Sequence, residues 1–541
     1  MKNKNNLMLF GAIIITLLMI SSATAVSINH INNNKNLTDI LSAGSPPNIE
    51  WEKIYTNSYS ESGIALDKTS DNGYILAGIR KEDIHNFSVV LIKTDQNGTK
   101  EWNKTFFKGK INLKIVQQTD DDGYILFTVG VLESNKIQSK LTKLFSNGTV
   151  EWIKNFEGDS DYDSISEAWQ TSDGGFILVG GKINGLIDSD VWVIKTNSQG
   201  NIEWEKTFDN SDLLHKYSDA GMSVCELSNG GYIIGGTTAK VIGINTYLNV
   251  WLIKIDSNGN KIIDKTYGES FSRAMWGVNS IRETNDGGFI AVGCRNTKSD
   301  KEKTFFWAIK TDSNLNQEKV FEINPDKEKY ESFNSVRTTY EGGFILIGQG
   351  YTMEPGYVSC YSKLLKLNKN LYNEWYVDYE YDDGLVYNGV EQTTDNGFVV
   401  VGANKENVSL LKIAKENLPP NKPEKPVGAV LVNVNGIYHY KTKTTDPEGD
   451  QVYYKFDLGD GRHWFKGEYD SGEEINVALY WTLPGSFKLK VRALDVKGHY
   501  GEWSDPLSVT VPKQKATNRL FQYLQERYPV IFSLINQILR I

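Results

Sequence analysis

Four carboxylates in the C-terminal part of the sequence have the residue types and spacing of a calcium site. Asp446, Glu448 and Asp450 alternate within one short segment, and Asp495 follows later in the chain. Calcium binds six to eight oxygens, mostly carboxylates and carbonyls on flexible loops. This ligand set is incomplete, and Asp and Gly also shape turns without a metal. We therefore expect no obligatory cofactor and keep calcium as the alternative.

A second set of charged and aromatic side chains lies in the segments that lead from one repeated unit to the next. Carboxylates beside aromatic rings suit sugars, peptides or a cation, and two carboxylates about 5–9.5 Å apart could catalyse hydrolysis. Loops that are merely solvated are the alternative. The candidate residues of this ligand face are Asp161, Tyr162, Asp163, Tyr217, Asp219, Arg273, Trp276, Glu331 and Asp382.

The sequence lacks the motifs of the common enzyme classes. It has no HExxH, GxSxG or P-loop sequence, its six histidines are scattered, and its three cysteines form no CxxC pair. The formal net charge of −9, without a Lys/Arg-rich run in the body of the chain, argues against nucleic-acid binding. We expect no catalytic residues, and a role in binding or structure is favoured over catalysis.

The first residues are typical of an export signal. A positively charged start precedes an uncharged apolar stretch over residues 7–20, and small residues mark a cleavage site after Ala25. We predict that residues 1–25 are a signal peptide and that residues 26–47 are a linker. The alternative is an uncleaved segment that anchors the protein in a membrane.

A triplet of glycine, an aromatic residue and an apolar residue recurs seven times, at intervals of 50–57 residues. Asp, Asn or Glu precedes each triplet, as in Asp173-Gly174-Gly175, and such pairs favour tight hairpin turns. Each unit then carries a strand that ends near a lysine, a second turn, and a fourth strand that often holds a tryptophan. Four short strands in a unit of this length are typical of a propeller blade.

The two ends of the repeat array complement each other. A proline-rich stretch replaces the fourth strand after Lys412, whereas Trp51 marks a fourth strand with no unit before it. The N-terminal strand should therefore complete the last unit and leave no free sheet edge. We predict an all-β fold in which residues 48–417 form a seven-bladed β-propeller closed by the N-terminal strand.

The consensus of the repeat is Thr-x-Asp-Gly-Gly-Phe-Ile-x-x-Gly, then Trp-x-Ile-Lys-Thr-Asp, then Gly-x-x-x-Trp-x-Lys-Thr-Phe. It resembles the β-propeller repeats of secreted and cell-surface proteins in archaea and bacteria. The resemblance covers about two thirds of the chain. It implies a surface location and a scaffold role, but no uniform activity.

A second domain follows a proline-rich linker at residues 418–426. Short alternating strands over residues 427–512 predict a small, immunoglobulin-like β-sandwich. The segments 446–450 (DPEGD) and 456–461 (FDLGDG) resemble the PKD-like domains of extracellular proteins, although Leu458 stands where that family usually carries an aromatic residue. The resemblance implies spacing or adhesion at a cell surface.

Residues 513–541 differ in character from the sandwich. They are basic, and apolar residues recur at helical spacing on both sides of Pro529. We predict a short amphipathic helical tail that is too short to span a bilayer. It either packs on the sandwich or lies on a membrane surface.

These observations predict an extracellular or cell-surface protein. We expect binding, adhesion or scaffolding, with the propeller as the platform for a glycan, a peptide or an envelope protein. The alternatives are a hydrolase or lyase of extracellular polysaccharide, and a structural envelope component without a discrete ligand. Glycosylation sequons, which agree with export, occur at Asn36, Asn86, Asn97, Asn103, Asn147 and Asn407.

Overall fold

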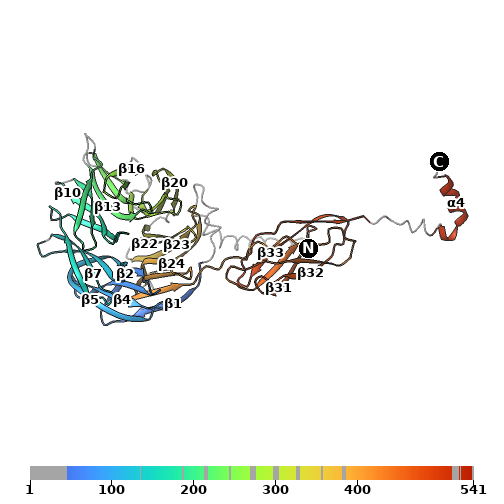
Figure 1. Ribbon diagram of the computed structural model, residues 1–541, viewed down its shortest axis with the longest axis horizontal. Coiled ribbons are helices and arrows are strands. Elements are labelled where there is room, and N and C mark those ends of the chain that lie inside the picture. The colour runs from blue at the N-terminus through green and yellow to red at the C-terminus, as the bar shows by residue number, and fades with distance from the viewer. Residues whose placement is uncertain are drawn as a thin grey trace, which may run out of the picture. The chain divides into compact units, whose positions relative to one another are not determined.

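The computed structural model describes residues 46–538, except residues 135, 185–187, 212–216, 243–244, 269–275, 297–303, 324–328, 355–356, 381–384, 514–522 and 524. The chain forms two compact units, residues 1–415 and residues 416–541. Nearly all of the described secondary structure is β-strand, which confirms the all-β prediction (Figure 1). The predicted signal peptide lies outside the described residues.

In the described part of unit 1, the strands pair antiparallel in seven successive groups of four. β5 is long enough to end the first group and begin the second. The first four groups contain β2 (Glu61–Lys68), β3 (Tyr74–Lys81), β4 (Phe87–Thr94), β5 (Lys100–Gln118), β6 (Tyr124–Val131), β7 (Ile137–Leu144), β8 (Val150–Phe156), β9 (Ser164–Gln170), β10 (Phe176–Ile183), β11 (Ser189–Thr196), β12 (Ile202–Phe208), β13 (Tyr217–Glu226), β14 (Tyr232–Ile242), β15 (Asn245–Ile255) and β16 (Lys261–Tyr267).

The last three groups follow the same order, except that the seventh takes its fourth strand from the N-terminus. They contain β17 (Trp276–Glu283), β18 (Phe289–Arg295), β19 (Phe305–Thr311), β20 (Gln317–Glu322), β21 (Lys329–Thr338), β22 (Phe344–Glu354), β23 (Tyr357–Leu367), β24 (Asn373–Glu380), β25 (Leu385–Gln392), β26 (Phe398–Asn404), β27 (Asn407–Ile413) and β1 (Ile49–Tyr55).

The hairpin between the first and second strands of each group follows from its Asx-Gly sequence. The residue before the repeated glycine has positive φ in every group, and only Gly, Asn and Asp occupy that position, as in Asn72 (65°) and Gly174 (80°). The repeated glycine itself leaves no room for a side chain, because a Cβ on Gly175 would lie 2.1 Å from the carbonyl oxygen of Thr196. The turn chemistry therefore sets the start of each second strand.

A buried lysine connects this hairpin to the end of the third strand, and we call the arrangement the lysine lock. In the third group, Lys195 Nζ lies 2.7 Å from Asp173 of the hairpin, 2.9 Å from the carbonyl oxygen of Thr196 and 3.2 Å from Glu203 of the fourth strand. Lys195 is 3% exposed. The same Lys–Asp pair joins Lys93 to Asp71, Lys143 to Asp121, Lys310 to Asp286 and Lys412 to Asp395.

The cores of unit 1 lie between neighbouring strand groups. Alternate side chains of one strand enter the cores on its two sides: Ile75 and Ala77 pack with the second group, whereas Leu76 packs with the seventh. Seven such clusters occur among the described residues, and each is shared by two successive groups. Burial of both sheet faces explains why the second and third strands are continuous apolar runs.

The N-terminal strand joins the seventh group, as the sequence predicts. β1 pairs antiparallel with β27, with Trp51 opposite Lys412 and Tyr55 opposite Val408. Tyr55 also enters the core shared by the seventh and first groups, and its hydroxyl donates a 2.8 Å hydrogen bond to the carbonyl oxygen of Gly98 in the first group. β1 therefore links the last strand group to the first.

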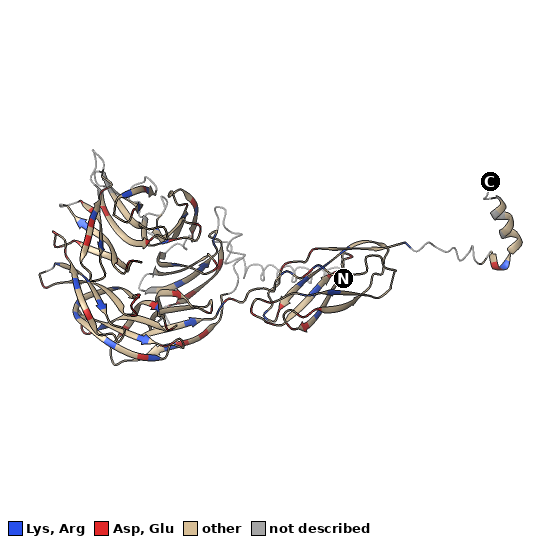
Figure 2. Cartoon of the chain, in the orientation of Figure 1, with Lys and Arg blue, Asp and Glu red and all other residues tan. Residues whose placement is uncertain are grey.

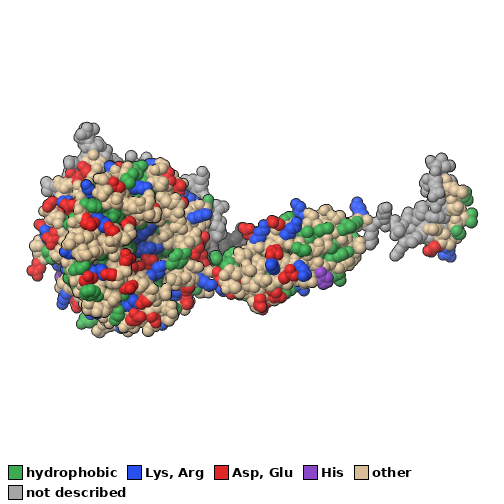
Figure 3. Space-filling view, in the orientation of Figure 1, with side chains coloured by type: hydrophobic (Ala, Val, Ile, Leu, Met, Phe, Trp, Pro, Cys, Tyr) green, Lys and Arg blue, Asp and Glu red, His purple; other side chains and the backbone are tan. Residues whose placement is uncertain are grey.

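Unit 2 consists of two sheets that enclose one core. One sheet contains β28 (Val427–Gly428), β29 (Tyr438–Thr442) and β32 (Ile475–Leu479), and the other contains β31 (His463–Tyr469), β30 (Val452–Asp457), β33 (Gly485–Asp495) and β34 (Leu507–Val511). Fully buried Trp481 packs edge-on against Tyr440, and its indole donates to the carbonyl oxygen of Leu458. Apolar side chains also gather on the outside of this unit (Figure 3).

The C-terminal tail contains the helix α4 (Pro529–Ile538), in agreement with the predicted helical segment. Val530, Ile531 and Leu534 are exposed on it. Among the residues that the structure describes, no helix is long and apolar enough to cross a membrane. Contact of the tail with a membrane surface stays a prediction.

Replacement of Trp51 by alanine should destabilise unit 1 by about 2–4 kcal/mol, because the half-buried indole packs on Gly98 of the first group. The free energy of unfolding, measured by urea titration of tryptophan fluorescence and circular dichroism, tests this expectation. The matched control is Ile49→Ala on the same strand, where 57% of the side chain is exposed and we expect a change of about 0.5 kcal/mol or less. Equal effects of the two substitutions would contradict the linking role of β1.

Candidate functional site

The first strands of the seven groups lie side by side in a closed cycle, in which β25 contacts β2. Each first strand has a β-bulge at the same place, for example at Asn279 and Asn388. The amides of these two asparagines each donate a 2.7 Å hydrogen bond to a carbonyl oxygen of the next first strand, at Phe333 and Gly63 respectively. Since bulges redirect side chains, the seven strands present corresponding positions towards one region.

One of these positions, six residues before the repeated glycine, carries five kinds of side chain in the seven groups. The residues are Asp67, Gln117, Trp169, Cys225, Arg282, Arg337 and Glu391. Glu167 lies two residues before Trp169, on the same face of β9. We call Asp67, Glu167, Trp169, Arg282, Arg337 and Glu391 the central cluster.

Members of the central cluster contact one another across strand groups that are not neighbours. The guanidinium groups of Arg282 and Arg337 lie 4.9 and 5.4 Å from the ring centre of Trp169, although the three residues belong to the fifth, sixth and third groups. Arg337 also forms a short ion pair with Glu391 of the seventh group. The cluster therefore occupies the space enclosed by the first strands at this level.

Burial and neighbouring charges shift the pKa values in the central cluster. Burial, and then the negative charge of Glu391, raise the pKa of Asp67 to about 7, although Arg337 and two backbone N–H groups act in the opposite direction. Burial and the positive charge of Arg337 lower the pKa of Arg282. A half-buried carboxyl group that titrates near neutrality is common at functional sites.

Hydrogen-bond donors in the cluster are less well satisfied than acceptors. Asp67 accepts from the N–H groups of Lys68 and Gln118, at 2.9 Å each. Arg282 donates one hydrogen bond within the described part of the chain, to the carbonyl oxygen of Ile281. The buried indole N–H of Trp169 has no acceptor there. These unused donors could bind an anion.

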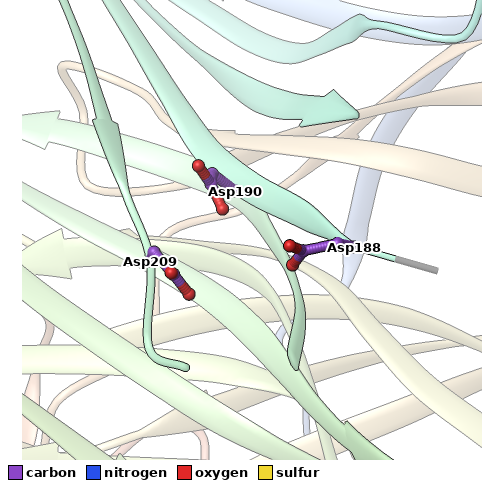
Figure 4. Close-up of side chains that lie close together, drawn as sticks. All are labelled: Asp188, Asp190 and Asp209. Atoms are coloured by element: carbon purple, nitrogen blue, oxygen red, sulfur yellow. The ribbon is translucent and has the colours of Figure 1, made fainter. Parts of the chain in front are cut away.

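A separate acidic cluster lies near the β10–β11 hairpin (Figure 4). Carboxylate oxygens of Asp188, Asp190 and Asp209 lie within 4.8 Å of one another. The three residues come from the segment before β11, from β11 itself and from the segment after β12. Such a group could hold a divalent cation, but Asp188 and Asp190 also interact with other groups of the chain.

Three predicted ligand-face carboxylates are buried and accept hydrogen bonds from other groups of the chain. Asp163 accepts from the N–H groups of Ser160 and Ile183, at 2.9 and 2.7 Å. Fully buried Asp219 accepts from the Asn210 N–H at 2.7 Å, and burial raises its pKa to about 6. Glu331, 3% exposed, accepts from the hydroxyl of Tyr361. The three residues occupy corresponding positions at the start of the first strands, where Asp163 and Asp219 hold loop segments and Glu331 contacts β23.

The other predicted ligand-face residues have different surroundings. Asp161 and Tyr162 are exposed in the connection before β9. Tyr217 and Trp276 begin β13 and β17, but their side chains lie outside the described part of the structure, as do Arg273 and Asp382. The described members of the set are divided between buried and exposed positions, and a common ligand face stays a prediction.

The sequence reasoning missed the central cluster because it considered only the connections between groups. Alignment of the seven repeats on their glycines would have found the cluster. The turn and lock positions repeat almost unchanged, whereas the position six residues before the glycine varies among acidic, basic, aromatic and amide side chains. Figure 2 shows acidic and basic residues interspersed along the strands of unit 1, so net charge alone does not mark the site.

Two of the four carboxylates predicted to bind calcium shape turns in unit 2, whereas Glu448 accepts from the Leu418 N–H and Asp450 pairs with Lys497. Asp446 accepts from the N–H groups of Glu448 and Asp450, and Asp495 accepts from those of Lys497 and His499. The second carboxylate oxygen of Asp446 is buried without a hydrogen-bond partner. In the described chain, these residues do not form a group of three ligand atoms within 4.8 Å of one another.

The predicted glycosylation sequons differ in accessibility. Asn97, Asn103 and Asn147 are exposed on unit 1, and Asn86 and Asn407 are half-buried. Asn36 lies outside the described residues. Asn147 accepts a hydrogen bond from the Thr149 N–H, which is typical of a turn.

The solved structures that are similar to this chain include two of different kinds, and neither establishes a family. The PKD domain of an M14-like peptidase from a Thermoplasmatales archaeon is 35% identical, covers 18% of this chain and 100% of its own, and has a TM-score of 0.17. The S. cerevisiae core factor is 12% identical, covers 64% of this chain and 57% of its own, and has a TM-score of 0.34. Both TM-scores are too low to imply a shared overall fold. No family model matches the chain, and no curated protein matches it.

Asp67→Asn and Asp173→Asn should change the free energy of unfolding in opposite directions at pH 8. The folded-state pKa of Asp67 is raised to about 7 from 3.8, so ionisation of Asp67 destabilises the fold increasingly as the pH rises from about 4 to 7. The stability of Asp67→Asn relative to wild type should therefore increase by about 2–3 kcal/mol between pH 5 and pH 8. Urea titrations at the two pH values measure the difference.

Asp173→Asn is the matched control, because its pKa shift has the opposite sign. Burial alone would raise the pKa of Asp173, but Lys195, Thr171 and the Gly175 N–H lower it to about 2. The stabilisation that the ionised Asp173 carboxylate gives the fold is complete above pH 4 and is lost only as the pH falls towards 2. This variant should be less stable than wild type by a similar amount at pH 5 and pH 8. A pH-independent effect of Asp67→Asn would contradict the assigned environment of Asp67.

Proposed function

We propose that unit 1 is a closed seven-bladed β-propeller and that the protein is an exported binding protein of the cell surface. The seven hydrophobic clusters support the closure, because each joins two successive strand groups and one of them joins the seventh group to the first. The pairing of β1 with β27 supports it too, since it completes the last group of four. In a closed ring, every strand group packs against another group on both of its faces.

The observation that carries the binding role is the diversity of side chains in the central cluster. The positions that maintain the repeat carry similar residues in nearly every group, as the lysine locks do. The position that contributes Asp67, Trp169 and Arg282 differs between groups, although partly buried charges are costly and a scaffold does not need them. In our proposal these side chains form a specific binding site, with unit 2 as a spacer.

A hydrolase or lyase acting on polysaccharide is the second candidate function. It is favoured by the pKa of about 7 for Asp67 beside the negative charge of Glu391, because a general acid near neutral pH needs a raised pKa. Against it, Asp67 accepts two backbone hydrogen bonds and Glu391 is paired with Arg337. These contacts suit positioning better than proton transfer.

The test uses the chain from residue 26 onward on glycan and peptide arrays, with release of reducing ends from polysaccharides measured in parallel. We expect saturable binding without turnover. Binding should fall at least about tenfold in Arg337→Gln, which removes the guanidinium that lies over the Trp169 ring and leaves Glu391 without its ion pair. The control Asp161→Ala, on the exposed connection, should bind like wild type. Turnover abolished by Asp67→Asn would favour the enzyme, and binding lost only in Asp161→Ala would move the site to the connections.

We also propose that the loop end of unit 2 binds calcium through Asp446 and Asn417. Asp446 is 5% exposed, and one of its carboxylate oxygens has no hydrogen-bond partner. The side-chain oxygen of Asn417 is likewise buried without a partner, and its amide donates to Asp495. Unsatisfied buried oxygens of this kind are suitable calcium ligands.

Calcium should raise the melting temperature of unit 2 in the full chain, and EGTA should reverse the change. The variant Asp446→Asn should lose most of this response. Asp457→Asn is the matched control, because Asp457 lies in the same unit, at the end of β30, and its carboxylate already pairs with Lys490. A melting temperature that is unchanged by both calcium and EGTA would refute the calcium site.

A further inference from the structure

We propose that the central cluster binds the free carboxylate group of an acidic saccharide, between the guanidinium of Arg282 and the indole N–H of Trp169. This inference rests on the proposed binding function and names its ligand class. It follows from the unused hydrogen-bonding capacity of the cluster, from its charges and from the small side chains beside its arginines.

Arg282 has donors that no described group of the chain uses. A guanidinium carries five N–H groups, and Arg282 donates one hydrogen bond, to the neighbouring carbonyl of Ile281. Its nearest carboxylate oxygen, on Glu167, is 3.9 Å away, which is beyond hydrogen-bonding distance. The side chain is only 14% exposed, so water satisfies these donors less well than it would at an open surface.

Trp169 supplies a second donor beside the first. Its indole N–H is buried without an acceptor among the described residues, and its ring lies 4.9 Å from the Arg282 guanidinium. A carboxylate has two oxygens and can accept from a guanidinium and a neighbouring N–H together. One bound carboxylate would thus satisfy both groups.

The carboxylates of the cluster have partners already, which favours an anionic ligand over a cationic one. Both oxygens of Asp67 accept backbone hydrogen bonds, and Glu391 is held by Arg337. Glu167 accepts a 2.7 Å hydrogen bond from the Val224 N–H. The hydrogen-bonding groups that lack described partners are therefore the donors.

Small side chains lie beside the arginines of the cluster on the first strands. The residues two positions before Cys225, Arg282, Arg337 and Glu391 are Ser223, Ser280, Ser335 and Gly389. Since residues two apart in a strand face the same side, these positions add little bulk next to the guanidinium groups. The hydroxyls of Ser223 and Ser280 accept hydrogen bonds from the N–H groups of Ile281 and Val336, so these positions do not compete for the donors of the guanidinium groups.

The groups exposed at the bulges suit a saccharide better than a peptide. Asn334 offers an amide to ligand hydroxyls, and Lys114 adds a positive charge for a carboxylated sugar. Peptide recognition generally uses apolar pockets for side chains. In this region of the first strands the exposed groups are polar, so we assign the carboxylate to a sugar acid.

Titration calorimetry of the chain from residue 26 onward with trigalacturonate, and with neutral galactotriose as the paired probe, tests this assignment. We expect binding of the acidic trisaccharide only. Arg282→Gln should weaken it by about 10–100-fold, because a charge-assisted pair of hydrogen bonds is lost. Trp169→Phe, which keeps an aromatic ring but removes the N–H, should weaken it by about 3–10-fold.

Controls separate binding from folding. Arg462→Gln makes the same change in unit 2, where Arg462 pairs with Asp460, and should leave trigalacturonate binding unchanged. Arg282→Lys keeps the charge but not the fork of donors and should bind with intermediate affinity. Thermal unfolding followed by circular dichroism checks the fold of each variant. If Arg282→Gln does not fold, Trp169→Phe provides the binding test in its place.

The outcomes distinguish this inference from the proposed function. Equal binding of the two trisaccharides, or binding unchanged in Arg282→Gln, would overturn the carboxylate assignment while leaving a binding protein. If the protein instead bound a peptide with a free C-terminus, and this binding were lost on amidation of the peptide and in Arg282→Gln, the assignment of the bound carboxylate to a saccharide would be overturned. If no glycan or peptide bound at all, the proposed binding function itself would be refuted.

Discussion

A buried lysine ammonium stands at the same place in six of the seven strand groups of unit 1, and in five of them it ties the first hairpin to the ends of the third and fourth strands. Burial of the charge costs several kcal/mol unless nearby groups compensate it, so an Asp of the hairpin, a backbone carbonyl and often a Glu of the fourth strand converge on it. The fourth group illustrates the dependence. Its hairpin has Asn229 in place of the Asp, and its Lys254 is half-exposed and donates instead to the carbonyl oxygen of Ser313 in the next group.

The lysine lock also connects the two ends of unit 1. Lys412 lies 2.9 Å from Asp395 of its own hairpin and 3.6 Å from Glu50, which the N-terminal strand supplies. In the other locks the corresponding Glu comes from the strand that follows the lysine, as Glu203 follows Lys195. The polar contact and the apolar packing of β1 thus take the place of the missing fourth strand in the seventh group.

A scaffold held together by repeated turns and locks leaves one set of positions free to vary. The central cluster uses these positions, and its asymmetry is chemical: Arg282 and Arg337 come from neighbouring groups, and Glu391 and Asp67 from the next two in the cycle. At the other end of the first strands, the buried carboxylates Asp163 and Asp219 hold loop segments instead, and Glu331 contacts Tyr361 of β23. We infer that recognition is concentrated in the middle of unit 1 and that the acidic connections mainly maintain its shape.

The sequence by itself determined the all-β class, the seven repeats, the turn positions and the place of the N-terminal strand, because these depend on short-range signals: positive φ at residues such as Gly174, alternation along a strand, and a count of fourth strands. It also identified the lysines, though not their Asp partners. Tertiary structure decided which polar residues form a site. Asp67 and Glu391 are far apart in the chain, as are Trp169 and Arg337, and only the packing of the first strands around a common centre brings them together. Burial likewise decided the role of Asp219, since an Asp before a strand looks the same in sequence whether it faces a ligand or holds the backbone N–H of Asn210.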